Sequence, residues 1–489
     1  MRRAGILSVT AVAAATTLSR HREAAESEPE ALRASPSGLP IASPSKPYWL
    51  EKLPERLQAY RNFRSSPTLP KRANVVIVGS GMSGVSTAYH LAQATSASSD
   101  PSVLLLDARE ICGGATGRNG GFLHAHGLNE WWTLYKKYGA RTATELCWFE
   151  RKGREAINEV SSELAVDCDI DRDIKLVMLF PGDDQKGMKE TLGAFYPVRS
   201  LLRAFGVRVL ESAGEIAKEL NVGDGQVLRN AVVLEKGCDT FWPAKFVLGV
   251  LEDCIERGVE VHAHTPVVEV TKKDGKVLVR TARGNVLCEK VVYATNAWTS
   301  ALIPELAACI QPVLNTVVCT APNNGALLAD PLRRTGQSVH PGYHYFHQRE
   351  DGRIVLGGFR HLLDGRGVGV FEDGAPSSET MESVRAFLPS LGFQVGIAIE
   401  HEWTGIIGWS MDGLPFVGPL PGNDTAFVCA GFSGHGMTQA WLSGKATANM
   451  VLGKAPGRPF VRAFLPSEER VRATSKLGGD WFSYEKAKQ

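Results

Sequence analysis

The sequence lacks the features of three common classes of protein. Its 54 lysine and arginine residues nearly balance its 52 aspartate and glutamate residues, so the net charge is only +2. Proteins that bind nucleic acid usually carry a basic patch, so that function is not expected. No internal repeat of about 20–50 residues is present, which argues against solenoids and propellers.

The chain also lacks paired cysteines. Its nine cysteines are scattered, with no Cys-x-x-Cys pair. In a chain of 489 residues this pattern fits free thiols in a reduced compartment better than a disulfide framework. We therefore expect an intracellular protein, cytoplasmic or mitochondrial.

His262 and His264 share one face of an expected strand, but no further ligand is evident, so no metal site is predicted.

No stretch is suited to cross a membrane. The apolar part of "MRRAGILSVTAVAAATTLSRHR" is about 15 residues, too short for a comfortable span. This basic segment has no acidic residue before Glu23, and it fits a mitochondrial presequence, a signal peptide or a disordered start. Residues 23–47 are rich in Pro, Ser and Glu and are typical of a linker. The folded part is expected to begin near Tyr48.

What the sequence does contain is a glycine-rich turn. Residues 75–78 are an apolar, β-branched run that predicts a buried parallel strand, and an apolar stripe at helical spacing follows Gly84. Gly79 would allow the tight turn, Gly81 the close approach of a pyrophosphate, and Gly84 the close packing of helix on strand. The pattern indicates a dinucleotide site; the alternative is an ordinary glycine-rich turn between a strand and a helix.

An acidic residue supports the dinucleotide interpretation. A second apolar strand, residues 103–106, ends at Asp107, whose carboxylate can accept a hydrogen bond from a ribose 2′-OH. Asp107 stands 28 positions after Gly79 (107 − 79), beyond the usual ~20, and a polar loop at residues 94–102 accounts for the excess.

Three later segments are suited to contact a ligand. The loop "DAREICGGATGRNGGF" follows Asp107, although a flexible surface loop is the alternative. Residues 257–298 predict a β-meander and a buried strand that ends in small residues. Residues 425–453 predict another strand, glycine turn and helix. In that turn "GFSGH" is no nucleophile elbow, because His435 stands where the last glycine is required.

Together these segments resemble the FAD-dependent D-amino-acid oxidase superfamily, the glycine oxidase/sarcosine oxidase group. "GATGRNGGF", "VVYATNAW", "WTGIIGWSMDGLPFVG" and "GFSGHGM" follow the first glycines in the order of that family. They look most similar to the γ-glutamylputrescine oxidase-like branch, over residues 48–453. The resemblance implies an α/β fold, with a Rossmann-like FAD-binding domain of the glutathione-reductase type and an antiparallel-sheet α+β substrate domain.

Both domains would be discontinuous. The resemblance places the FAD-binding domain at residues 48–125, 231–300 and 401–460, and the substrate domain at residues 126–230 and 301–400. Residues 1–47 would be the N-terminal segment and linker, and residues 461–489 a C-terminal tail.

The resemblance also implies noncovalent FAD. Some relatives tether the flavin at the positions of Gly405 or Arg118, where this chain has no nucleophile; Cys112, Cys319 and His435 are the fallback tethers. NAD would explain the first glycines equally well, but not the late turn, which would cap the N1–C2=O edge of a flavin. The expected FAD contacts are Gly79, Ser80, Gly81, Met82, Ser83, Gly84, Asp107, Ala108, Thr116, Gly117, Arg118, Asn119, Gly120, Gly121, Val268, Ala294, Thr295, Asn296, Gly431, Gly434, His435, Gly436 and Met437.

The implied reaction is oxidation of the C–N bond of an amine or amino acid to an imine, with O2 as acceptor and H2O2 as product. A dehydrogenase that passes electrons to a quinone or an electron-transfer protein is an alternative, and a flavin-binding protein without turnover is another. The catalytic residues stay unassigned; Tyr345, Arg349, Arg360 and His435 are candidates, although for each of the first three the residue pattern favours a solvent-exposed strand residue.

Position 407 bears on the substrate. Amino-acid oxidases of this family clamp the substrate carboxylate with an arginine in a Gly-x-Arg-Pro turn, and here Ile407 and Gly408 stand at the arginine and proline positions of "TGIIGW". Burying a carboxylate against isoleucine would cost several kcal/mol. An amine, polyamine-like or N-substituted, is therefore expected rather than a simple α-amino acid. Arg349 or Arg360 could bind an acidic group that lies farther from the reacting carbon.

Overall fold

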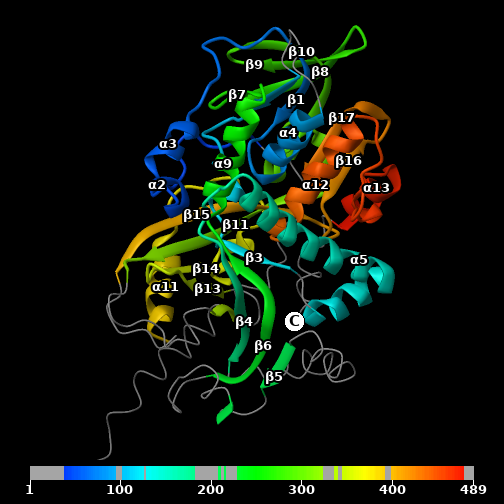
Figure 1. Ribbon diagram of the computed structural model, residues 1–489. Helices are drawn as coiled ribbons and strands as arrows, with labels where there is room; N and C mark the ends of the chain where they lie inside the picture. The colour runs from blue at the N-terminus through cyan, green and yellow to red at the C-terminus, as the bar shows by residue number, and fades with distance from the viewer. Residues whose placement is uncertain are drawn as a thin grey trace, which may run out of the picture.

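The computed structural model describes residues 38–94, 102–125, 128–181, 207–210, 214–215, 228–322, 335–339, 344–390 and 398–477. Its strands form two sheets, one in the upper part of Figure 1 and one in the lower part. The first sheet has eight strands and the second has nine. This two-sheet α/β architecture confirms the fold class expected from the sequence.

The eight-stranded sheet is built around β1. Four consecutive buried residues end β1, as expected for a strand covered on both faces. The strands run in the order β16-β17-β10-β1-β2-β7; β1, β2, β7, β10 and β17 are parallel, and β16 is antiparallel. The strands β8 and β9 extend β10 as an antiparallel meander, as predicted. Their bounds are β1 Arg72–Val78, β2 Val103–Leu106, β7 Glu260–His262, β8 Val267–Lys273, β9 Lys276–Thr281, β10 Gly284–Tyr293, β16 Phe416–Leu420 and β17 Asn423–Ala430.

Helices cover this sheet and carry its apolar core. The helices α4 and α12 pack against each other, and α9 packs against α4 (Figure 1). Ten of the 14 residues of α9 are buried, so it is enclosed by the core on most of its surface. The bounds are α2 Tyr48–Glu51, α3 Glu55–Arg61, α4 Met82–Ala94, α9 Pro243–Glu256 and α12 Gly436–Val451.

The nine-stranded sheet forms most of the second layer. Its order is β15-β11-β14-β13-β12-β4-β6-β3, with β5 beside β6, and its pairs are antiparallel except for β12 with β4. The strands β13 and β14 form an antiparallel hairpin around the turn at residues 349–353. The bounds are β3 Phe122–His124, β4 Asp171–Pro181, β5 Val207–Leu210, β6 Leu228–Thr240, β11 Ile310–Thr320, β12 Thr335–Val339, β13 His344–Gln348, β14 Ile354–Gly358 and β15 Ile399–Ser410.

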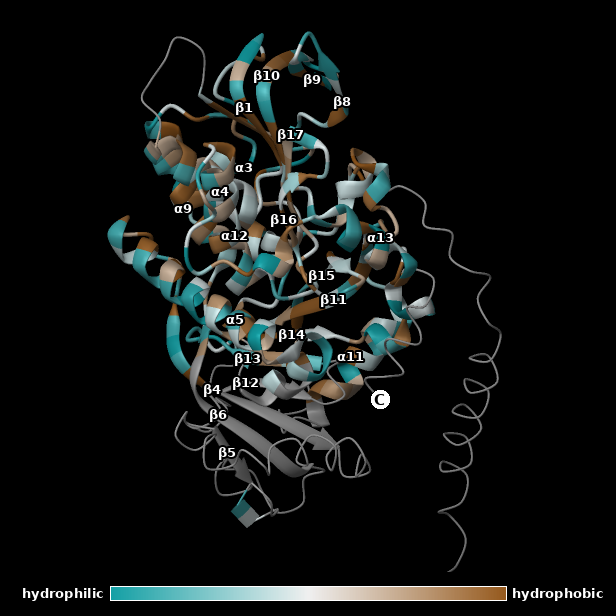
Figure 2. Cartoon of the chain, turned by 90° about the vertical axis from the view of Figure 1, so that its right-hand side faces the viewer, coloured by the Kyte–Doolittle hydropathy of each residue, from teal (hydrophilic) through white to brown (hydrophobic). Residues whose placement is uncertain are grey.

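Three further helices lie on the outside. The helix α5, Leu128–Glu163, bends at Gly139, where φ is 79°. The helices α11, Ser378–Ser390, and α13, Glu468–Leu477, complete the described α-helices. The central strand β11 is coloured mostly hydrophobic, whereas α5 alternates between hydrophobic and hydrophilic residues (Figure 2). Among the described helices, none is long and apolar enough to span a membrane.

Contacts at the N-terminus begin earlier than the sequence predicted. Residues 38–47 are described and are hydrogen-bonded to the body of the protein through Ser45, ahead of the expected start at Tyr48. The linker interpretation therefore needs correction for residues 38–47, because the segment satisfies polar groups of two distant loops. The basic segment at residues 1–22 lies outside the described residues.

Candidate active site

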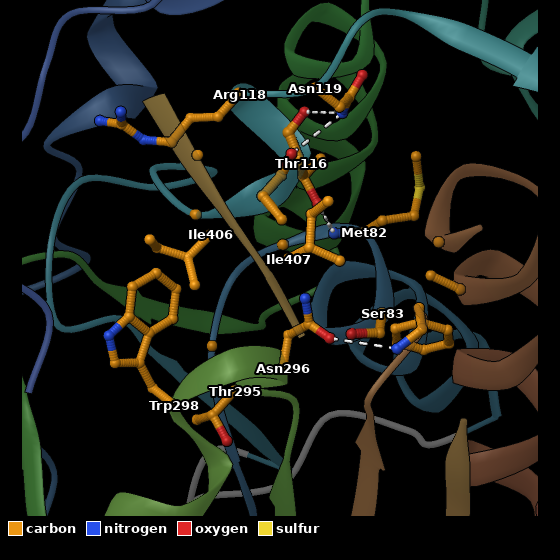
Figure 3. Close-up of a pocket in the computed structure, with 18 of the residues that line it drawn as sticks. Met82, Ser83, Thr116, Arg118, Asn119, Thr295, Asn296, Trp298, Ile406 and Ile407 are labelled. Atoms are coloured by element: carbon orange, nitrogen blue, oxygen red, sulfur yellow. Dashed lines mark hydrogen bonds between the residues drawn. The ribbon is translucent and has the colours of Figure 1, made fainter. Parts of the chain in front are cut away.

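A cavity of about 570 Å³ lies where β1, β2 and β10 end and the second sheet begins. Parallel sheets bind ligands at the carboxyl ends of their strands, so the topology places a ligand here. Figure 3 shows side chains from both ends of the chain converging on this space: Met82 and Ser83 from α4, Asn296 after β10, and Ile406 and Ile407 from β15.

The first glycine turn has the geometry of a phosphate-binding turn. Gly79 has φ of +106°, a backbone conformation that other residues rarely adopt. A Cβ at Gly84 would lie 1.8 Å from the carbonyl oxygen of Gly79, so only glycine lets α4 pack this close to β1. A Cβ at Gly81 would lie 3.0 Å from Thr116 Oγ1, and that hydroxyl also accepts from the Met82 N–H at 3.0 Å. The N-terminus of α4 thus opens on the cavity, where it favours an anion.

Asp107 lies beside this turn, at the end of β2. Its Oδ2 accepts from the N–H of Ser80 at 2.8 Å and from the Ser80 hydroxyl, and its Oδ1 accepts from the N–H of Arg109 at 2.9 Å. Burial raises the pKa of Asp107, although these hydrogen bonds act in the opposite direction. A carboxylate has about four acceptor sites, so three donors leave one for a ribose hydroxyl.

In the loop after β2, the side chains of Asn119 and Arg118 point in different directions. Asn119 Nδ2 donates to the carbonyl oxygens of Ala115 and Thr116, at 3.1 and 2.7 Å, which fixes the loop along the cavity. The guanidinium of Arg118 points away from Thr116 and Asn119 (Figure 3). It donates to the carbonyls of Gly113 and Thr404 at 2.8 and 2.9 Å, and burial lowers its pKa to about 10.

The late glycine turn is tied to the first sheet by Asn296. Asn296 Oδ1 accepts from the N–H of Gly431 at 3.0 Å, and the N–H of Ser433 donates to the carbonyl of Gly408 at 2.9 Å. These bonds fix the start of α12, so that Gly434, His435, Gly436 and Met437 line the cavity. A helix N-terminus held in this way can stabilise negative charge on a ligand without reorganising.

Tyr345 contributes a wall from the second sheet. Its ring lies against two backbones: a Cβ at Gly120 would come within 2.3 Å of it, and a Cβ at Gly357 within 2.2 Å of its hydroxyl. Asn315 Nδ2 donates to Tyr345 Oη at 3.0 Å, which leaves the phenol hydrogen for another acceptor. Burial raises the pKa of Tyr345 to about 12, so this group is a neutral donor at physiological pH.

Arg360 and Trp409 form another part of the wall. The Arg360 guanidinium lies 5.3 Å from the centre of the Trp409 ring, and both residues line the cavity beside Ile407. His124 also lines it; burial lowers the pKa of His124 to about 4, so the imidazole is uncharged near neutral pH.

Most of the expected residues reach the cavity. Tyr345, Arg360 and His435 line it, as do these expected cofactor residues: Gly79, Ser80, Gly81, Met82, Ser83, Asp107, Ala108, Thr116, Arg118, Asn119, Gly120, Ala294, Thr295, Asn296, Gly434, Gly436 and Met437. Gly84, Gly117, Gly121 and Gly431 are not among the lining residues, and each packs closely against another segment of the chain. Val268, which the resemblance expects to contact the adenine end through its backbone, is not among the lining residues; it is 52% exposed, and its neighbour Val267 lines the wall.

Arg349 is a correction to the sequence-based list. It does not line the cavity; its guanidinium lies against the rings of Tyr48, Trp49 and Trp242, at 5.5, 5.5 and 4.9 Å. It also pairs with Asp169 at 2.9 Å. Arg349 begins the turn after β13, beyond the part of the hairpin that faces the cavity, and therefore fastens α2 to the second sheet.

The alternative metal site and the two cysteine tethers receive no support from the geometry of the described residues. His264 Nε2 is 2.6 Å from Asn62 Oδ1 and His262 Nδ1 is 3.3 Å from Arg283, so the two imidazoles face different partners. The described residues contain no cluster of three or more His, Cys, Asp or Glu suited to a metal. Cys112 and Cys319 are buried away from the cavity wall, and burial raises the pKa of both thiols.

The sequence analysis missed several residues of the wall. Arg109 lies 5.4 Å from the ring of Trp298, and both line the cavity. Arg109 follows Asp107 by two positions, and Trp298 closes "ATNAW", so proximity to the motifs was the available signal. Phe122 and Thr438 likewise lie in or directly beside the motifs. Others have no local signal, since the fold alone brings them here: Gly38, Leu39, Pro40, His124 and Asn315.

Comparison with known proteins identifies the family to which the chain belongs. Residues 74–450 match the family described as FAD dependent oxidoreductase, DAO. The chain belongs to this family. Membership confirms the resemblance stated above and makes the protein an FAD-dependent oxidoreductase that acts on amines or amino acids.

Curated relatives and solved structures agree. The chain is 28% identical to the gamma-glutamylputrescine oxidoreductase of Escherichia coli over 78% of its own length and 84% of that protein. It is 25% identical to the probable oxidoreductase OrdL of Rhizobium meliloti, over 80% and 86%. The structure of glycine oxidase from Geobacillus kaustophilus superposes with a TM-score of 0.65 at 19% identity, over 82% of this chain and 99% of that one, which shows the shared fold.

The residues present fit FAD. Both glycine turns open on one cavity, a carboxylate lies at the end of β2, and the start of α12 faces the second sheet. Gly79–Gly81 with Thr116 would hold the pyrophosphate, Asp107 the ribose, and Gly434–Met437 the flavin ring. Noncovalent binding of FAD is typical of this family, and among the described residues of the wall none is a cysteine.

Proposed function

We propose that the protein is an amine oxidase: it oxidises a C–N bond beside an amine nitrogen and reduces O2 to H2O2. Bound FAD would supply the redox chemistry by accepting a hydride equivalent from the carbon next to nitrogen. The observation that carries the choice of an amine is Ile407, which lies in the cavity wall at the position where the resemblance expects a carboxylate-binding arginine.

The wall near Ile407 is suited to an uncharged amine. His124 is neutral near pH 7, and Tyr345 offers a neutral O–H oriented by Asn315. A neutral amine can accept that hydrogen bond through its nitrogen lone pair, which would orient it. Ile406 and Ile407 provide apolar contact for a carbon chain and exclude water from it.

Arg360 supports a substrate with an acidic group at its far end. Its guanidinium lies over Trp409 in the cavity wall, whereas Arg349, the other candidate, is not among the lining residues and pairs with Asp169. A γ-glutamyl amine has its carboxylate several bonds from the reacting carbon, so Arg360 could bind it while Ile407 contacts the chain. The name of the relative from Escherichia coli is consistent with this substrate class.

Peroxide formation tests the acceptor. The purified holoenzyme should produce one H2O2 per amine oxidised under air with no added acceptor. If O2 is not consumed while a soluble quinone restores turnover, the protein is a dehydrogenase. If neither acceptor supports turnover and no amine reduces the flavin, it is a flavin-binding protein without this activity.

A further inference from the structure

Residues 38–47, named here the strap, precede the part of the chain that matches the family, residues 74–450. The strap nevertheless contributes to the cavity, because Gly38, Leu39 and Pro40 line its wall. Leu39 is 47% exposed, one of few large apolar side chains among the described residues with so much exposed surface. An apolar side chain placed at a ligand cavity gains stability when a ligand covers it.

One residue fastens the strap. Ser45 donates from its N–H to the carbonyl of Asp373 at 2.8 Å, and its Oγ donates to the same oxygen at 3.0 Å. The Ser45 carbonyl accepts from Arg118 Nη2 at 2.7 Å, and its Oγ accepts from Arg118 Nη1 at 3.1 Å. The Thr404 N–H also donates to Ser45 Oγ, at 3.0 Å. A single serine thus joins the strap to three distant segments.

The base to which Ser45 is fastened is rigid. Asp373 is fully buried and accepts from both terminal nitrogens of Arg109, at 2.8 and 2.9 Å; Arg118 Nε lies 3.4 Å from the same carboxylate. Separating buried charges leaves them unpaired, which is costly, so this cluster resists rearrangement. Arg109 and Arg118 also line the cavity, so the residues that bind Ser45 and its partner Asp373 are also part of the wall of the cofactor site.

We propose that the strap is an additional part of the cofactor site, held by Ser45 across the cavity so that bound FAD leaves only when the strap is displaced. Pro47 and the buried residues of α2 follow directly after Ser45, so they strengthen the anchor at the same end of the segment. Leu39 and Pro40 are therefore positioned at the wall from the Ser45 side. This inference rests on FAD binding and is independent of which amine is oxidised.

The test is the rate at which FAD leaves the full-length holoenzyme. Ser45→Ala removes the hydroxyl and its three hydrogen bonds, and the exposed Ser43→Ala on the same strap is the matched control. Release is measured by dilution, from the fluorescence of free FAD. We expect Ser45→Ala to speed release about tenfold or more, Leu39→Ser to speed it by less, and Ser43→Ala to leave it unchanged.

Melting temperatures separate this role from a purely structural one. The substitution Ser45→Ala should lower the melting temperature of the holoenzyme more than that of the apoprotein, because the strap acts on bound FAD. Release at the wild-type rate, or equal losses for apoprotein and holoenzyme, would overturn the proposal. A wild-type chain that takes up no FAD would overturn the cofactor assignment, and the strap with it, whereas a yellow chain that no amine reduces would refute only the proposed function.

Discussion

Asn296 and Gly431 join the ends of two parallel strands: the side-chain oxygen of Asn296 accepts the Gly431 N–H at 3.0 Å, although the residues are 135 positions apart. Asn296 itself has a positive φ of 44°, a strained conformation for a residue with a side chain. The bond fixes the turn from which α12 begins, so it controls how well that helix is placed to face the flavin.

Replacing Asn296 with alanine should therefore weaken cofactor binding. Loss of the acceptor leaves the Gly431 N–H without this partner, which costs about 1–3 kcal/mol. We expect the Kd for FAD to rise about tenfold, as measured by titration of the apoprotein. Asn285→Ala, on the exposed part of β10, is the control and should change nothing. Equal affinity in both variants would show that the late turn does not depend on Asn296.

The first turn can be tested with Gly81→Val. A Cβ at Gly81 already lies 3.0 Å from Thr116 Oγ1, and valine adds two methyl groups where the phosphates are expected. The purified variant should be folded by circular dichroism and nearly colourless, whereas the wild type should be yellow. A folded variant with a full complement of FAD would mean that the cofactor lies elsewhere.

The attachment of the flavin has its own test. No described residue of the cavity wall is a cysteine, and the positions where the resemblance expects tethers hold Arg118 and Gly405. Acid precipitation should release the yellow colour into the supernatant. Colour kept in the washed pellet would indicate a covalent bond, with His435 as the candidate in the wall.

The role of Arg360 predicts a selective effect. In Arg360→Leu, KM for amines with a distant carboxylate should rise about tenfold or more, because the loss of a charged hydrogen-bonding partner costs roughly 1.5–3 kcal/mol. Neutral diamines should be oxidised no worse than before. Arg385→Leu, whose side chain is 59% exposed, is the matched control. A uniform loss for all amines would assign Arg360 to the structure of the cavity rather than to recognition.

The sequence predicted the cofactor half of the site better than the substrate half, for a physical reason. Gly79, Asp107 and Gly434 lie in turns directly after strands, so local pattern and strand order place them together. The substrate wall combines residues of the four strands β3, β11, β13 and β15, and their placement depends on sheet register. For this reason the sequence pattern named both Tyr345 and Arg349 as candidates, although of these two only Tyr345 lines the cavity.

The strap escaped prediction for a different reason. Residues 38–47 are rich in proline and serine, a composition typical of linkers, and they contain no apolar periodicity. Their order comes from hydrogen bonds of Ser45 with Arg118 and Asp373, which are more than 70 positions away. Such long-range polar contacts leave no trace in local composition.

The most direct test of the proposed amine oxidase is anaerobic reduction of its bound flavin. Putrescine-like amines, γ-glutamyl amines, sarcosine, glycine and D-alanine are mixed in turn with the oxygen-free holoenzyme, and the loss of yellow colour is followed by stopped flow. Ile407 and Arg360 predict that γ-glutamyl or other chain amines bleach the flavin fastest. If glycine, sarcosine or D-alanine bleaches it fastest, the carboxylate is bound close to the reacting carbon and the proposal of an amine substrate is wrong.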